Sequence, residues 1–311
     1  MTHDESRRGT AYGLLAYGIW GAFPLYFHAL KPAGAWEILS HRILWTLGLC
    51  ALILVARRDL AWTRALVQRP RLSLGITAAA LLIAVNWVVY VAAVLNGRTT
   101  DASLGYFLNP LVTVALGVLV LRERLRPLQW VAVAIGAVAG VYLSVAGRSI
   151  PWIALTLALS FASYGLVKKK VGATLGAMHS LAAETAVLGP IAGVMLAVLT
   201  ARGTTTFTTV GPGHTALLVF AGVATATPLL FFAAAARRIP LVLIGLLQFI
   251  TPVLQLLCAV LLLGERLSPA RWVGFGIVWV ALAVLTADAV RAARTARAVR
   301  AAEEIAEECL P

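Results

Sequence analysis

Long apolar runs separated by short polar segments recur along the whole chain. Most runs are about 20 residues long, the length of helix that crosses a ~30 Å hydrocarbon core. The alternation of apolar and polar residues that marks a half-buried strand is absent. Because lipid leaves backbone groups no other partner, spans of this kind are expected to be helical. The pattern predicts an all-α integral membrane protein with ten transmembrane helices, at 10–30, 36–56, 72–96, 101–121, 128–146, 151–167, 176–199, 214–236, 239–263 and 270–288.

An internal repeat relates the two halves of the chain. The segment 107–130, FLNPLVTVALGVLVLRERLRPLQW, returns 142 positions later as FITPVLQLLCAVLLLGERLSPARW, and no gap is needed to align them. The same offset lays the first five predicted helices over the last five. Because five is odd, the second copy enters the membrane upside down, which is the usual architecture of secondary transporters. We therefore expect inverted five-helix repeats at 10–146 and 151–288, with a cytoplasmic segment at 1–9 and a cytoplasmic tail at 289–311.

Composition agrees with a membrane protein, since 60% of the residues are hydrophobic and 13% are charged, against about 25% charged in soluble domains. The net charge of +13 suggests nucleic acid at first sight. However, 19 of the 26 Lys and Arg residues fall in the segments on one predicted side and 6 in those on the other. Such a bias marks the cytoplasmic side. It predicts that both termini lie in the cytoplasm, and because it explains the positive charge, no nucleic-acid partner is expected.

Enzymatic and cofactor chemistry has little support in the sequence. The three cysteines and five histidines are scattered without the spacing of a metal site, and no phosphate-binding glycine loop is present. We expect no cofactor, no metal and no catalytic residue. A non-transporting receptor or scaffold leaves the inverted repeat unexplained. Gly136 and Gly140 form a GxxxG pair, which fits packing within the chain and also a homodimer.

Ionisable residues inside predicted spans are candidates for function because burying them in a bilayer is costly. Arg42 lies about six residues, or ~9 Å, from the end of its span, and its equivalent in the repeat is Glu184. Arg42 is predicted to hold an anionic part of a substrate; alternatively it extends outward to the headgroups. Glu184 is predicted to couple transport to protons, or else it hydrogen-bonds a neighbouring helix. His41 is a second candidate for proton coupling or a packing residue, and Glu37 is expected to be solvated.

Aromatic and amide side chains within the spans suggest the walls of a site for an organic solute, because such sites combine apolar walls with a few polar groups. Asn86 and Tyr90 share one face of their helix. Asn86 serves equally well as a helix–helix hydrogen-bonding residue. Besides Arg42, the predicted substrate-binding residues are Tyr17, Trp20, Asn86, Trp87, Tyr90, Tyr106, Asn109, Tyr164 and Gln248.

Several ordered motifs resemble one transporter family. YGIWGAFPLYF at 17–27, EILSHRILW at 37–45, the segment 86–110, QFITP at 248–252 and GERL at 264–267 are similar to the RarD branch of the EamA family, in the drug/metabolite transporter superfamily. The resemblance implies ten helices in two EamA repeats and passage of small organic solutes. We expect an exporter of metabolites or drugs in the bacterial inner membrane that works by alternating access to a central cavity; a facilitative permease without a coupled ion is the alternative.

Overall fold

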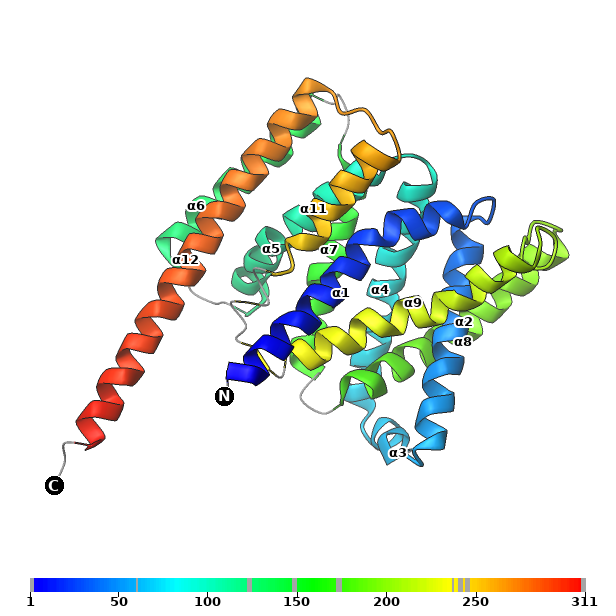
Figure 1. Ribbon diagram of the computed structural model, residues 1–311, viewed down its shortest axis with the longest axis horizontal. Helices are drawn as coiled ribbons and strands as arrows, with labels where there is room; N and C mark the ends of the chain where they lie inside the picture. The colour runs from blue at the N-terminus through cyan, green and yellow to red at the C-terminus, as the bar shows by residue number, and fades with distance from the viewer. Residues whose placement is uncertain are drawn as a thin grey trace.

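A computed structural model describes residues 3–59, 61–121, 125–146, 150–171, 175–236, 238–239, 243 and 247–308. These residues form helices joined by short turns, and none of them lies in a strand (Figure 1). The first half contains α1 (His3–Ala29), α2 (Ala35–Ala56), α3 (Ala61–Gln68), α4 (Pro70–Leu95), α5 (Thr99–Leu121) and α6 (Pro127–Ala146). The second half contains α7 (Trp152–Val171), α8 (Ala177–Ala201), α9 (Pro212–Ala236), α11 (Ile250–Leu257), the π-helical turn η1 (Cys258–Leu262) and α12 (Pro269–Glu308).

The all-helical membrane architecture predicted from the sequence is confirmed. Seven of the described helices are long and apolar enough to cross a bilayer, namely α2, α4, α5, α6, α8, α9 and α12. Two shorter apolar helices, at Trp152–Lys168 and Ile250–Leu262, add to them. The count of ten spans stays a prediction. The first and last helices are longer than predicted. Helix α1 begins near the N-terminus, and α12 continues through the predicted tail as one 40-residue helix.

Much of the helix packing among the described residues is repeated when the two halves are exchanged, but the contacts of α5 with α6 and α12 have no comparable equivalent in contacts of α11. The 142-residue offset pairs α1 with α7, α2 with α8, α4 with α9, α5 with α11 and α6 with α12. The contact of α4 with α7 has its equivalent in α9 with α1, and that of α5 with α7 in α11 with α1. The α2–α8 and α6–α12 contacts are their own equivalents. The repeat seen in the sequence is therefore also a repeat in the packing.

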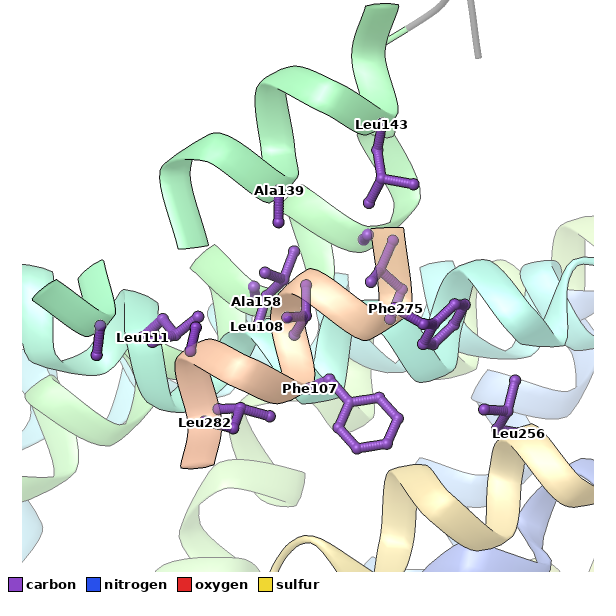
Figure 2. Packing of buried hydrophobic residues seen from close by; sticks show 14 residues of the cluster. Phe107, Leu108, Leu111, Ala139, Leu143, Ala158, Leu256, Phe275 and Leu282 are labelled. Carbon is purple, nitrogen blue, oxygen red and sulfur yellow. The ribbon is translucent and has the colours of Figure 1, made fainter. Parts of the chain in front are cut away.

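A cluster of buried side chains joins the α6–α12 pair to the rest of the bundle. Figure 2 shows Phe107, Leu108 and Leu111 of α5 beside residues of α6 and α12. Gly136 belongs to this contact, since a Cβ there would come within 2.6 Å of the Leu111 side chain. This close approach agrees with the interpretation that the GxxxG pair serves packing within the chain. At Gly140 an added Cβ meets nothing within 4 Å.

Candidate functional site

The guanidinium of Arg42 lies inside the bundle, between α1, α2, α4 and α9. The residue is only 4% exposed, so its side chain does not extend to the surface. Its Nε donates a hydrogen bond to Thr225 Oγ1 on α9 at 2.8 Å. Its Cζ lies 4.2 Å from the ring centre of Trp87, and 5.4 and 5.5 Å from those of Phe23 and Phe27. Desolvated cation–π contacts of this kind contribute about 2 kcal/mol and offset part of the cost of burial.

No carboxylate pairs with Arg42 among the residues that the structure describes. Its electrostatic neighbours are phenol groups, those of Tyr26, Tyr90 and Tyr106. A guanidinium carries five N–H donors, and Nε is the one for which a protein acceptor is seen. The site is thus a cation enclosed by aromatic rings with unused donors, and an anion would complete it.

Asn86 serves as a link between helices. Its Nδ2 donates to Leu157 O at 3.0 Å and to Ser160 Oγ at 3.1 Å, both on α7. Its Oδ1 accepts a bond from the Tyr106 hydroxyl of α5 at 3.0 Å. The helix–helix interpretation from the sequence therefore describes its contacts, and its polar group is occupied by the protein. Asn86 positions Tyr106 near Arg42.

Six buried side-chain polar atoms have no hydrogen-bond partner within the described part of the chain, and they include Tyr90 Oη, Asn109 Oδ1 and Gln255 Oε1. Leaving such a group unpaired costs about 1–3 kcal/mol. Tyr90 packs edge-on against Tyr106 and Phe27, so its unpaired hydroxyl belongs to the surroundings of Arg42. It offers a second hydrogen bond to a group held there.

Glu184 lies in a separate, fully paired cluster between α7 and α8. Its Oε1 accepts bonds from Lys168 Nζ at 2.6 Å and from Ser180 Oγ at 2.9 Å. Its Oε2 accepts a bond from the Tyr164 hydroxyl at 3.2 Å. Lys168 was not among the predicted site residues, because the run Lys168–Lys170 resembles a charged loop, whereas α7 continues to Val171. Tyr164 therefore contacts the proton-coupling candidate, and its ring packs on Phe161, which also packs on Tyr106 beside Arg42.

His41 is in a third cluster, where the loop between α8 and α9 folds onto α2. Its Nδ1 accepts a bond from Trp45 Nε1 at 3.2 Å, and its ring stacks on Phe207 at 4.6 Å. Glu37 was expected to be solvated, and this was wrong, because it is 2% exposed. It accepts bonds from Thr206 N at 2.6 Å and Thr206 Oγ1 at 3.0 Å. These contacts hold the loop against α2, where its Phe207 covers the ring of His41.

Tyr17 and Trp20 line the contact between α1, α9 and α11. Their rings pack on each other and on Phe232. Their carbonyl oxygens accept bonds from Thr251 Oγ1 at 2.9 Å and from Gln255 Nε2 at 3.2 Å. Gln248 is partly buried in a turn just before α11. Of the predicted binding residues, the structure thus gathers Trp87, Tyr90, Tyr106 and Asn86 around Arg42.

Sequence reasoning overlooked much of the aromatic enclosure. Phe23 and Phe27 are four residues apart on α1 and so share a face, a signal that was present in the sequence. Thr225 carried no signal, because a threonine in an apolar helix usually bonds the preceding turn. It does so here as well, donating to Ala221 O at 2.8 Å while it accepts from Arg42.

Comparison with known proteins shows which family this chain resembles and which relatives are similar to it. The EamA-like transporter family matches the chain twice, over residues 7–146 and 148–287. Protein RarD of Streptomyces exfoliatus is 51% identical over 297 residues, covering 95% of this chain and 93% of the relative. An uncharacterized transporter of Pseudomonas aeruginosa is 45% identical, covering 94% and 98%. Protein RarD of Escherichia coli K12 is 38% identical, covering 93% and 97%.

A solved crystal structure shares the fold. It has a TM-score of 0.59 and 18% identity, covering 90% of this chain and 98% of the other. The names of the relatives point to transport and away from enzyme activity, and the apolar helices and bacterial relatives indicate a multi-pass inner-membrane protein. The two family matches, together with relatives named RarD, confirm the resemblance found in the sequence. The chain belongs to the RarD branch of the EamA-like transporter family.

Proposed function

We propose that the protein is a secondary transporter that exports small organic metabolites or drugs, and that Arg42 binds an anionic or zwitterionic part of its substrate. The observation that carries this proposal is the buried guanidinium of Arg42 with no carboxylate partner among the described residues. A charged side chain at the centre of a membrane helix costs about 2.5–3.5 kcal/mol or more. A substrate carboxylate or phosphate would accept two parallel hydrogen bonds from the guanidinium.

The proposed mechanism is alternating access, and the repeated helix packing supports it. In our proposal the repeats 10–146 and 151–288 are inverted, with the 1–9 segment and the 289–311 tail in the cytoplasm. The α1–α9 and α4–α7 contacts are equivalent under exchange of the halves, as are α1–α11 and α5–α7, and this partial symmetry supports a second state in which the halves exchange these packings. The start of α1 and the end of α12 lie on the same, lower side of Figure 1, which fits termini in one compartment. Arg42 is enclosed here, and opening towards either side would expose it.

A facilitative permease is the second candidate, and one observation favours it. Glu184, the proposed proton-coupling group, is already held by Lys168, Ser180 and Tyr164. Protonation of Glu184 would remove its attraction to Lys168 and could drive a conformational step. If instead the Lys168–Glu184 ion pair stays intact throughout the transport cycle, Glu184 takes up no proton, and the protein is a facilitative permease.

The experiment is a thermal-shift screen of purified protein against amino acids, nucleosides and amphipathic drugs. A ligand that binds only the folded state raises the melting temperature. Anionic or zwitterionic compounds should stabilise the protein, and Arg42→Lys should weaken their binding roughly 10- to 100-fold, since lysine lacks the two-donor fork. The conservative variant keeps charge and stem length. Arg42→Lys with unchanged affinity and transport would refute the assignment of Arg42.

A further inference from the structure

A groove of about 820 Å³ separates α12 from α11, away from the Arg42 cluster. Helix α12 packs on α6 and α5, whereas α11 packs on α1 and α5. Buried Phe107 and Leu282 contribute to the lining of the groove, and both belong to the cluster of buried side chains in Figure 2. Val253 of α11 and Trp279 of α12 line it as well, and both are exposed. The groove is therefore an apolar channel open to the surroundings of the bundle.

The lining residues of α12 recur every three or four positions from Trp279 to Arg294, which places them on one face of the helix. Trp279 and Arg291 are twelve residues apart, or ~18 Å along the axis. One leaflet contributes ~15 Å of hydrocarbon, half of a ~30 Å core. The groove is thus about as long as one leaflet is thick, and Arg291 and Arg294 lie at the end of it where phospholipid headgroups would be.

Arg291 and Arg294 are exposed, and neither makes an ion pair within the described part of the chain. The nearby carboxylate of Asp288 is 5% exposed and accepts hydrogen bonds from the Arg126 guanidinium, so it is already used. Two free guanidinium groups at the end of an apolar channel complement a phosphate attached to acyl chains. A zwitterionic headgroup brings its own cation to the same place and is the poorer match.

We propose that this groove binds an anionic phospholipid, with the phosphate at Arg291 and Arg294 and an acyl chain along Val253 and Trp279. The chemistry of the occupant follows from the charge. A transmembrane helix of a second copy would cover the apolar walls but supply no anion to the arginines. Basic pockets next to membrane helices are known lipid-headgroup sites in general. The site is independent of Arg42 and of the direction of transport.

Native mass spectrometry of the full chain in neutral detergent tests the proposal. Dioleoylphosphatidylglycerol should bind at least 10-fold more tightly than dioleoylphosphatidylcholine. Arg291→Gln combined with Arg294→Gln should remove this preference. The matched control is Arg57→Gln combined with Arg58→Gln, two exposed arginines at the end of α2, which removes the same charge and should leave lipid binding unchanged.

A second variant tests the channel without altering charge. Ala287 lines the groove and is exposed, so Ala287→Trp should fill the groove, lower phosphatidylglycerol binding at least 5-fold and leave the lipid-free melting temperature unchanged. Three results would overturn the proposal. They are equal binding of the two lipids, equal loss in the Arg57/Arg58 control, and a dimer that replaces the lipid-bound species.

Discussion

The ion pair between Lys168 and Glu184 can be tested by a double-mutant cycle in which the two single variants are expected to differ. The carboxylate side chain is 5% exposed and the lysine side chain 27% exposed, with Nζ and Oε1 2.6 Å apart. Glu184→Gln keeps the shape of the acid and removes its charge. Lys168→Met keeps most of the stem and removes the cation.

The structure sets the order of the effects. Lys168→Met leaves a buried carboxylate without a cation, and breaking a buried pair in this way costs about 3–5 kcal/mol. Ser180 and Tyr164 still donate to Glu184, so we expect the lower end of that range. Glu184→Gln costs less, roughly 1–2 kcal/mol, because the partly exposed lysine can extend towards water and its pairing is screened. In the double variant no charge is stranded, so its cost should fall short of the sum by about 1–2 kcal/mol.

The assay is equilibrium unfolding of purified protein in mixed micelles with increasing SDS, followed by circular dichroism. Melting of each variant without SDS serves as a control for the native state. Single-variant costs that add within about 0.5 kcal/mol would show that the two groups are not coupled. Glu184→Gln as destabilising as Lys168→Met would refute the argument from burial.

Further predictions concern packing, the α8–α9 loop and topology. Gly222→Ala should destabilise the protein by about 1–3 kcal/mol, because a Cβ there would come within 2.6 Å of the α2 backbone. The control is Gly140→Ala, which should change the melting temperature little because an added Cβ there meets nothing within 4 Å. Glu37→Gln should speed proteolysis of the α8–α9 loop by weakening the bonds that hold it. A cysteine at Gly203 should react with an impermeant reagent in whole cells and one at Gln129 should not; labelling at Gln129 would reverse the proposed orientation.

Hydropathy and repetition predicted the architecture because both are local properties of the sequence. An apolar run of 20 residues requires a helix in lipid whatever surrounds it, and the 142-residue repeat needs no structure to be seen. Arg42 was also identified, since a charge inside a span is rare, and Trp87 was identified as an aromatic wall residue of a solute site. Their contact was not predicted, because it depends on how α2 and α4 are rotated towards each other, which no single-helix pattern contains.

The missed partners are all distant in sequence or concealed by a helix boundary. Glu37 looked solvated near a helix start, and its partner Thr206 lies 169 residues away. Lys168 looked like loop charge because it begins a run of three lysines. Asn86 presented two interpretations that only the positions of α5 and α7 could separate. In each case the helix was foreseen and the neighbour was not.

The repeat offers a physical comparison between the two buried charges. Arg42 and Glu184 are equivalent positions, and Lys168, which neutralises Glu184, is equivalent to Tyr26 on α1. If Arg42 were neutralised in the same way, position 26 would carry a carboxylate. It carries Tyr26 instead, whose hydroxyl donates a hydrogen bond to Leu217 O at 2.7 Å. One half therefore supplies its own counter-charge, while the other surrounds its cation with aromatic rings. A charge needed for packing alone could have been paired in both halves, and this difference supports the proposal that the anion at Arg42 arrives with the substrate.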